Sequence, residues 1–265
     1  MIIDGVNYHY RLVGQGDPVV LLHGFTGSSA NWSPVIDALA PDYTVLAVDL
    51  LGHGDTGSPA DPVRYRIERA AADLAELIPQ LVAPPVTLLG YSMGGRLALY
   101  AAIHYPHLIK RLILESASPG LEDAAERAAR RQSDEALADR IEREGIEAFV
   151  HYWEQIPLFA TQTPEQRDRL RAGRLKNAPT GLANSLRGMG TGAQPPLWDR
   201  LGEVGEHTLL IAGERDSKFT AIARRMASLI PRADLAIIPH AGHTVHLEQP
   251  DVYTKIIADW IERHA

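Results

Sequence analysis

The stretch that decides the fold runs Val86-Thr-Leu-Leu-Gly90-Tyr91-Ser92-Met93-Gly94-Gly95. An apolar run leads into a G-x-S-x-G element, and a helical pattern follows it directly. This context predicts a sharp strand-to-helix turn that holds the serine hydroxyl above the edge of a sheet. The glycines on both sides of the serine lack a Cβ atom, so neighbouring backbone can approach closely. Ser92 is therefore the candidate reactive residue, and the alternative is a tight turn with an incidental serine.

Two later segments supply the partners that a serine of this kind needs. A serine hydroxyl requires an adjacent imidazole, and the imidazole requires a carboxylate to orient it. In chains with this turn the acid comes first and the histidine second. Thr208-Leu-Leu-Ile-Ala-Gly-Glu-Arg-Asp216 places an acid beyond a predicted strand, and Leu235-Ala-Ile-Ile-Pro-His-Ala-Gly-His243 places a histidine after the next strand. The sequence therefore predicts a triad of Ser92, Asp216 and His243.

Other acids and histidines lie close to these positions. Glu214 and His240 are the nearest competitors, and His246 follows the predicted histidine by three residues. The Gly-x-x-Asp spacing after the strand favours the aspartate, and the Ala-Gly-His turn favours the second histidine. We interpret His240 and His246 as loop histidines, and Glu214 as an acid in solvent or in contact with a lid.

The rest of the chain alternates short apolar runs with longer amphipathic ones, which predicts a mostly parallel sheet covered by helices. Buried strands are predicted at Val19–Leu22, Thr44–Val48, Val86–Leu89, Arg111–Glu115, Thr208–Ala212 and Leu235–Ile238, and an antiparallel edge strand at Val6–Val13. Helices are predicted at Arg66–Leu81, Met93–Tyr105, Phe219–Ile230 and Pro250–Arg263. With the serine turn, this pattern predicts the α/β-hydrolase fold.

The stretch from 120 to 200 breaks this alternation. It holds no convincing strand, but four charged segments of helical character: Glu122–Gln132, Asp134–Glu144, Ile146–Glu154 and Pro164–Arg174. We predict a core domain formed by residues 1–119 and 201–265. Residues 120–200 are predicted to form a helical lid over the carboxyl edge of the sheet, where open α/β sheets bind ligands.

A third element is Val19-Val-Leu-Leu-His23-Gly24-Phe25, in which a strand runs into a His-Gly turn. Such a turn can supply one backbone amide of an oxyanion hole, and the residue after the serine supplies the other. We therefore predict that the N–H groups of Phe25 and Met93 stabilise a developing oxyanion. His23 is interpreted as a structural residue of the turn. His53, in a further loop, is interpreted as structural, with substrate contact as the alternative.

Composition narrows the classes of function. The chain has 265 residues, is 45% hydrophobic and contains no cysteine, which excludes disulfides and thiol chemistry. A formal net charge of −7 argues against general affinity for nucleic acid or anionic membrane. No apolar run approaches the roughly 20 residues of a membrane span. The N-terminal residues have no signal-peptide pattern. We expect a cytoplasmic enzyme that is a monomer or weak homo-oligomer.

Beyond these general motifs, the sequence resembles the 2-succinyl-6-hydroxy-2,4-cyclohexadiene-1-carboxylate synthases of menaquinone biosynthesis. The resemblance runs over nearly the whole chain and includes the predicted lid, where proteins of this fold usually diverge. It is carried by Gly90–Arg96, Glu115–Leu121, Glu126–Asp134, Trp153–Phe159, Leu182–Gly192 and Gly213–Phe219.

The resemblance implies an elimination of pyruvate rather than a hydrolysis. The family's substrate is a cyclohexene with a ring carboxylate, a succinyl chain and an enolpyruvyl ether. Its three carboxylates call for cationic partners, and guanidinium groups pair with carboxylates in bidentate fashion. The matching positions are Arg96, Arg130 and Arg174, with Trp153 and Tyr91 as pocket walls. No metal or organic cofactor is implied.

Two other functions remain open from the residues alone. A serine esterase or C–C bond hydrolase acting on a carboxylate-bearing substrate could use the same triad, because this fold hosts many reactions. The arginine-rich lid favours the polyanionic substrate over a neutral ester. A non-catalytic binding module is disfavoured, because all three predicted triad residues are present.

Overall fold

A seven-stranded sheet forms the centre of the computed structural model, which describes all residues from 1 to 265. The strand order is β3-β5-β4-β6-β7-β8-β9, and only β3 pairs antiparallel, with β5. The strands are β3 (Tyr10–Val13), β4 (Asp17–Leu22), β5 (Tyr43–Val48), β6 (Val86–Tyr91), β7 (Ile109–Glu115), β8 (His207–Gly213) and β9 (Ala233–Ile238). All six predicted strands are confirmed, and five of them are largely buried, whereas β9 at the edge of the sheet is only partly buried. The serine turn follows β6, the middle strand of the order.

The predicted edge strand at Val6–Val13 is partly wrong, because two separate strands share these residues. β2 (Val6–Asn7) pairs with β1 (Ile2–Ile3) in a small sheet, and β3 begins only at Tyr10. Tyr8 lies between them, and its buried hydroxyl donates a hydrogen bond to the carboxylate of Asp73. Val6 and Tyr8 are buried and Asn7 is exposed, so the predicted alternation continues through Tyr8 although the strand pairing does not.

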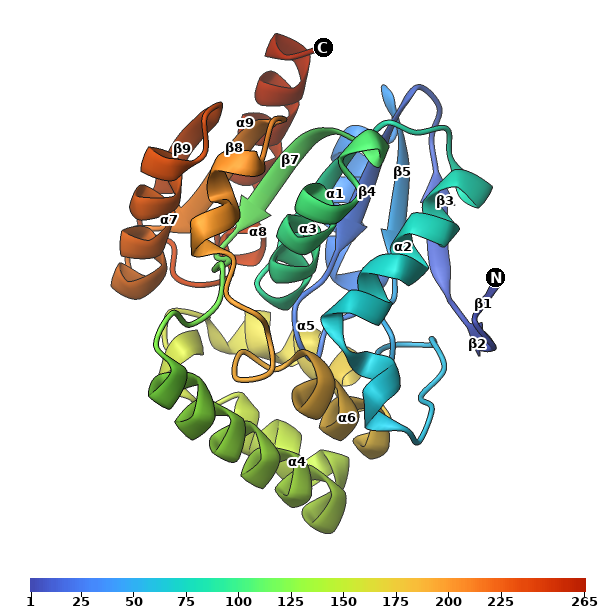
Figure 1. Ribbon diagram of the computed structural model, residues 1–265, viewed down its shortest axis with the longest axis vertical. Helices are drawn as coiled ribbons and strands as arrows, with labels where there is room; N and C mark the ends of the chain where they lie inside the picture. The colour runs from blue at the N-terminus through green and yellow to red at the C-terminus, as the bar shows by residue number, and fades with distance from the viewer.

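Helices cover both faces of the sheet because successive strand residues point to opposite sides (Figure 1). Along β4, Val20 and Leu22 face the larger core and Val19 and Leu21 face the smaller one. The larger core packs against α2 (Ile67–Leu81), α3 (Met93–His104) and α7 (Ser217–Leu229). The smaller core packs against α1 (Ser33–Leu39) and α9 (Pro250–Arg263). The short helix α1 was not predicted.

Between β7 and β8 the chain forms a helical insertion without a strand. Its helices are α4 (Ala124–Trp153), α5 (Pro164–Arg174) and α6 (Pro179–Met189). They gather at one end of the sheet (Figure 1). The three helices predicted between Glu122 and Glu154 form one segment, broken only at Gly145, whose φ is 80°. A buried apolar cluster that includes Phe149 and Leu182 joins α4 to α6.

Helix α6 was not predicted, because its composition is poor for a helix. Its two glycines are instead required by packing against the core. A Cβ on Gly181 would lie 2.4 Å from the carbonyl oxygen of Gly52, and one on Gly188 would lie 2.6 Å from backbone and side chain of Tyr65. The position of α6 therefore depends on close contact between its backbone and the core. Helix propensity depends on local sequence alone and cannot indicate such a contact.

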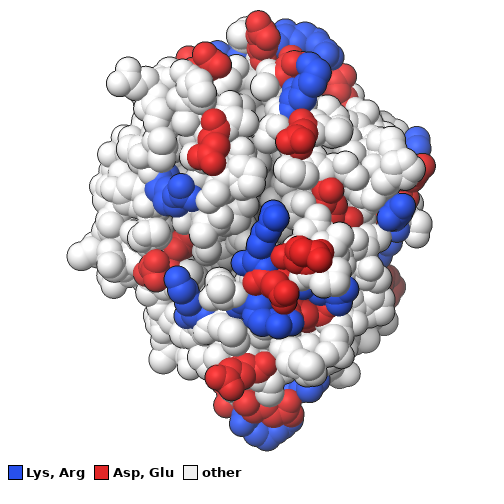
Figure 2. Space-filling view, turned by 180° about the vertical axis from the view of Figure 1, so that it is seen from behind, with Lys and Arg blue, Asp and Glu red and all other residues white.

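Short elements complete the chain. They are α8 (Val245–Glu248) and the 3-10 turns η1 (Ser29–Trp32), η2 (Pro62–Tyr65), η3 (Pro106–Leu108), η4 (Pro157–Phe159) and η5 (Trp198–Glu203). None of the helices is long and apolar enough to span a membrane. On the face shown in Figure 2, acidic and basic side chains are interspersed and form no broad patch of one sign.

Candidate active site

Ser92 lies in a strained turn between β6 and α3. Its φ is 50° and its ψ is −107°, a backbone conformation that costs non-glycine residues about 1–3 kcal/mol. The turn is held by a 2.8 Å hydrogen bond from the Ser92 N–H to the carbonyl of Glu115 on β7. Gly94 cannot carry a side chain, since its Cβ would lie 2.3 Å from the carbonyl oxygen of Leu22. The predicted reason for the flanking glycines therefore holds in the structure.

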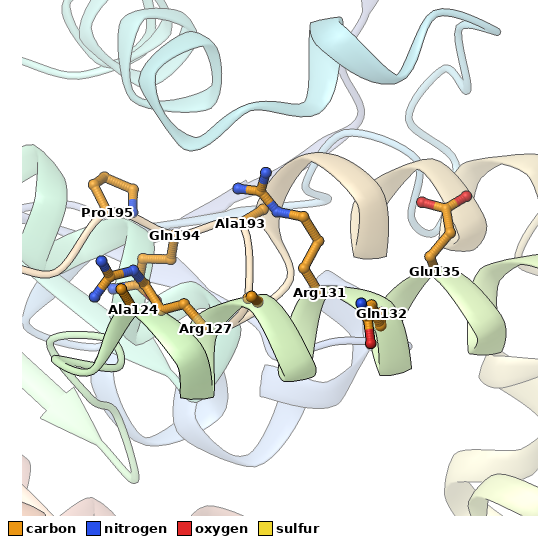
Figure 3. Close-up of a pocket in the computed structure, with 10 residues that line it drawn as sticks. Ala124, Arg127, Arg131, Gln132, Glu135, Ala193, Gln194 and Pro195 are labelled. Carbon is orange, nitrogen blue, oxygen red and sulfur yellow. The ribbon is translucent and has the colours of Figure 1, made fainter.

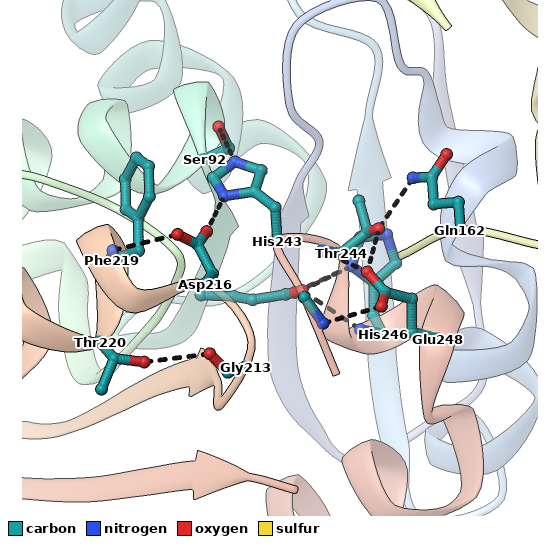
Figure 4. Close-up of polar contacts among 12 residues, drawn as sticks. Ser92, Gln162, Gly213, Asp216, Phe219, Thr220, His243, Thr244, His246 and Glu248 are labelled. Atoms are coloured by element: carbon teal, nitrogen blue, oxygen red, sulfur yellow. Dashed lines mark hydrogen bonds and ion pairs between the residues drawn. The ribbon is translucent and has the colours of Figure 1, made fainter. Parts of the chain in front are cut away.

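The three residues of the predicted triad are in hydrogen-bond contact (Figure 4). Nε2 of His243 is 3.1 Å from the Ser92 hydroxyl, and Nδ1 is 2.7 Å from Oδ2 of Asp216. The other carboxylate oxygen of Asp216 accepts the N–H of Phe219 and so caps α7. One carboxylate thus begins a helix and orients the histidine. This arrangement allows proton transfer from serine to imidazole.

Glu248 holds the loop that carries the histidine, and sequence reasoning missed it. Its carboxylate accepts the N–H of Gly242 at 2.7 Å and that of Thr244 at 3.1 Å, one residue before and one after His243. Gln162 of the insertion donates to the Thr244 hydroxyl at 2.8 Å (Figure 4). The only feature of the sequence that could have indicated this role of Glu248 is its place in the segment 244–250, directly after the predicted histidine.

His246 was interpreted as a loop histidine, and this interpretation is wrong. It lies in α8 and is buried, with Nδ1 2.9 Å from the carboxylate of Glu115. The His246 N–H also bonds to this carboxylate. The backbone of Glu115 holds Ser92, so one buried residue links the serine turn to the histidine loop. His240 and Glu214 are exposed, and the Glu214 carboxylate accepts the His240 N–H.

The two predicted oxyanion amides lie beside the serine. Phe25, Ser92 and Met93 line one cavity, and the Phe25 N–H has no hydrogen-bond partner in the protein. Met93 is the first residue of α3, and the first N–H groups of a helix lack intrahelical partners. The buried His23 holds the turn, since Nε2 accepts the Leu50 N–H and Nδ1 bonds the Gly24 carbonyl. Both amides are available to a ligand oxygen.

This cavity, called here the serine cavity, has a volume of about 230 Å³. Besides Ser92 and His243, it is lined by the predicted binding residues Arg96, Arg130, Tyr91 and Trp153. Lys218, which was not predicted, also lines it. The Trp153 ring packs edge-to-face on Phe25 at 5.3 Å, and its buried indole N–H has no partner.

Arg96 is buried, 9% exposed, without an acidic partner. Its guanidinium donates to the carbonyl of Met189 at 2.8 Å and to the side-chain oxygen of Gln194 at 3.0 Å. Burial and the nearby positive charge of Arg130 lower the pKa of Arg96 to about 10. Arg130 bonds to the buried Asp134 at 2.7 Å but is itself 44% exposed. This part of the cavity is therefore positively charged and favours an anion.

Arg174, predicted to bind substrate, does not line the serine cavity. It is buried beside Glu154, 3.5 Å from one carboxylate oxygen, and lies over the ring of Phe159. It faces a separate pocket of about 30 Å³. His53 also lies outside the serine cavity, with Nδ1 bonded to the carbonyl of Leu51. Glu154 accepts hydrogen bonds from Arg171 as well, so Arg174 belongs to a cluster of two arginines around this buried acid.

Other candidate sites lie outside the serine cavity. An open hollow of about 620 Å³ on α4 has Arg127, Arg131 and Glu135 in its wall (Figure 3). It has mixed charge and contains no triad residue. His9, Asp49 and Asp55 bring three donor atoms within 4.8 Å of one another. The Asp49 carboxylate accepts hydrogen bonds from the loop backbone, which accounts for the cluster without a metal.

Comparison with known proteins places this geometry in a family. Residues 17–250 match the model of the α/β-hydrolase fold. The chain is 47% identical to a Bacillus subtilis protein named provisionally as 2-succinyl-6-hydroxy-2,4-cyclohexadiene-1-carboxylate synthase, over 98% of this chain and 96% of that one. The chain belongs to the 2-succinyl-6-hydroxy-2,4-cyclohexadiene-1-carboxylate synthase family. The predicted fold and family are thereby confirmed, and the chain is an enzyme of the lyase class.

Further relatives agree with this family. A synthase from Shigella flexneri is 39% identical over 88% of both chains. The solved structure of the MenH protein from S. aureus superposes with a TM-score of 0.92 at 37% identity, and the match covers 97% of this chain and 98% of that one. The synthase family therefore matches this chain in both the core and the helical insertion.

Proposed function

We propose that this chain eliminates pyruvate from 2-succinyl-5-enolpyruvyl-6-hydroxy-3-cyclohexene-1-carboxylate in menaquinone biosynthesis. The product is 2-succinyl-6-hydroxy-2,4-cyclohexadiene-1-carboxylate, after which the family is named. The observation that carries the proposal is Arg96, a buried cation without an acidic partner in the cavity that holds Ser92 and His243. A buried charge is costly unless it is paired, so the cavity suits an anionic ligand.

Arg96 and Arg130 bind carboxylates of the substrate in this proposal. Both guanidinium groups line the serine cavity, and planar guanidinium matches carboxylate geometry. Trp153 and Tyr91 form walls against the ring. The helical insertion acts as a lid on the core domain of residues 1–119 and 201–265. Trp153 and Met189 contribute insertion atoms to the cavity wall.

The reaction begins with a proton transfer from carbon. His243, oriented by Asp216, draws the hydroxyl proton of Ser92, and the serine oxygen removes the ring proton next to the succinyl carbonyl. The electron pair moves into the carbonyl, whose oxygen is held by the N–H groups of Phe25 and Met93. The dienolate then collapses through the ring double bond and breaks the carbon–oxygen bond to the enolpyruvyl group. The released enolate takes up a proton and becomes pyruvate.

A serine oxygen is a weak base at neutral pH, so its use needs strong electrostatic support. The contact of 3.1 Å to His243 and the positive end of α3 both favour charge on Ser92. Mutational data on comparable enzymes assign about 2.7–4 kcal/mol to a single oxyanion donor. Two such donors supply the larger part of the stabilisation. The mechanism requires no metal or organic cofactor, and the only partner in the proposal is the small-molecule substrate.

Pyruvate release from this substrate tests the proposal. Wild type, Ser92→Ala and the control Ser228→Ala are compared with the uncatalysed rate. Ser228 lies on α7, where its hydroxyl bonds only to the local backbone. We expect wild type and the control to accelerate release, and Ser92→Ala to lose at least about a thousandfold in kcat. Equal rates for Ser92→Ala and wild type would remove the serine from the mechanism.

A hydrolase that acts on a carboxylate-bearing ester remains the second candidate, because the triad and oxyanion amides would also support an acyl-enzyme. A panel of aryl esters with and without a carboxylate distinguishes the two. Fast ester turnover with no acceleration of pyruvate release would favour hydrolysis.

A further inference from the structure

The serine cavity leaves one substrate carboxylate without a cation among the predicted arginines. The proposed substrate has three carboxylates, but only Arg96 and Arg130 of the three predicted arginines line the cavity. Arg174 is engaged with Glu154 and faces another pocket. The third basic side chain in the wall of the serine cavity, besides the two arginines, is Lys218.

Lys218 has no acidic or hydrogen-bonding partner within the protein. It forms no ion pair and no hydrogen bond, whereas Lys110 is paired with Asp17 and Lys255 with Asp259. Its side chain is exposed and lies in the first turn of α7, two residues after Asp216. An exposed, unpaired lysine is ordinarily a solvated side chain. Its presence in the wall of this cavity distinguishes it from the other lysines.

The position of Lys218 places its charge beside the triad. Its ammonium nitrogen is 6.0 Å from the ring centroid of Phe219, and that ring packs 4.6 Å from the ring of His243. Arg96 and Arg130 are instead held by residues 189–194 of the insertion and by Asp134. Arg96 and Lys218 therefore come from the core helices α3 and α7, and Arg130 comes from α4 of the insertion.

We propose that Lys218 binds the third carboxylate of the substrate and is a specificity-determining residue of the serine cavity. The proposal rests on the proposed lyase function. A lysine suits this role because its flexible stem and compact ammonium can follow a carboxylate at an open site, where a rigid guanidinium fork is not required. The contact lies outside the set of bonds that change, so it stabilises the bound substrate and the transition state equally.

The test compares Lys218→Met, Lys218→Arg and the control Lys176→Met with wild type in the pyruvate-release assay. Lys176 is exposed on the insertion and lines none of the cavities described above. Because the ion pair is partly exposed, we expect Lys218→Met to raise KM about three- to tenfold and leave kcat within about twofold. Lys218→Arg should recover most of the affinity. The dependence of kcat/KM on NaCl concentration should be weaker in Lys218→Met than in wild type.

Competitive inhibition identifies the carboxylate. Weaker inhibition of Lys218→Met by pyruvate assigns the lysine to the enolpyruvyl carboxylate. Weaker inhibition by the cyclohexadiene product assigns it to the ring or succinyl carboxylate.

Two failures are distinguishable. If wild type does not accelerate pyruvate release, the lyase function fails. If wild type is active and Lys218→Met has the KM and salt dependence of wild type, the function stands and the lysine proposal is overturned.

Discussion

Replacing Arg96 by methionine should weaken catalysis strongly but change the free energy of unfolding very little. The substitution keeps an unbranched, flexible side chain, shorter than arginine, and removes a charge that has no acidic partner. Burial lowers the pKa of Arg96 from 12.5 to about 10, which corresponds to about 3 kcal/mol against the charged form in the folded protein. The variant also loses two hydrogen bonds, to Met189 and Gln194, each worth about 1–1.5 kcal/mol. These opposing contributions nearly cancel.

We therefore expect the free energy of unfolding of Arg96→Met to lie within about 1 kcal/mol of wild type. Catalysis should fall far more, because the substrate carboxylate would be left in the cavity without its cation. Loss of one partner of a buried charge pair costs about 3–5 kcal/mol, which corresponds to a loss in kcat/KM of about two to four orders of magnitude.

Urea unfolding and pyruvate release measure the two quantities on the same preparations. Arg111→Met is the matched control, because Arg111 is also buried without an acidic partner but bonds to Thr87 and the carbonyl of His264, outside the serine cavity. The control should keep the kcat/KM of wild type. The reasoning is refuted if Arg96→Met retains kcat/KM within about threefold, or if its loss of activity is matched by a loss of several kcal/mol in stability.

Three shorter predictions concern the frame of the site. Gly94→Ala should abolish expression of folded protein, since its Cβ would lie 2.3 Å from a β4 carbonyl oxygen; circular dichroism of the soluble fraction checks this. Glu115→Ala should reduce the free energy of unfolding by about 2–6 kcal/mol, because the ring and the backbone N–H of His246 both lose their buried acceptor; a smaller loss in urea unfolding contradicts it. Burial lowers the pKa of His53 to about 3, below its unfolded value of about 6.5, so stability falls as pH drops below 6.5. Between pH 8 and pH 5 this costs about 2 kcal/mol, and the stability of His53→Gln should fall less over that range.

The parts of the site that could be predicted from the sequence depend on local backbone geometry. The turn at Ser92 needs glycines beside it. Asp216 lies where α7 begins, and an aspartate is favoured at such a position because its carboxylate caps the helix. The buried strands appear as continuous apolar runs because both of their faces are covered. Each of these signals lies within about ten neighbouring residues, which is why the fold was predicted correctly.

The parts that could not be predicted depend on contacts between distant segments. Arg174 lies 20 residues from Glu154 in sequence, and nothing local indicates that this acid is buried beside it. Lys218 appeared in a segment that supported the family resemblance, but its presence in the cavity wall depends on how α7 packs. Helix α6 is fixed by close approach to the core and not by its propensity. The cavity that a side chain faces can therefore be determined only from the tertiary structure.

The hydrogen bonds of Arg96 connect the helical insertion to the serine cavity. Arg96 lies on α3 of the core, yet its guanidinium is held by Met189 and Gln194 of the insertion. Arg130 lies on α4, and its partner Asp134 also accepts the N–H of Gly192 in the same segment. Residues 189–194 thus bind Arg96 directly and bind Arg130 indirectly, through Asp134. An exchange of this segment for that of an esterase would leave the triad intact, but it would remove the fixed positions of the two arginines. Substrate choice should accordingly follow this segment rather than the triad.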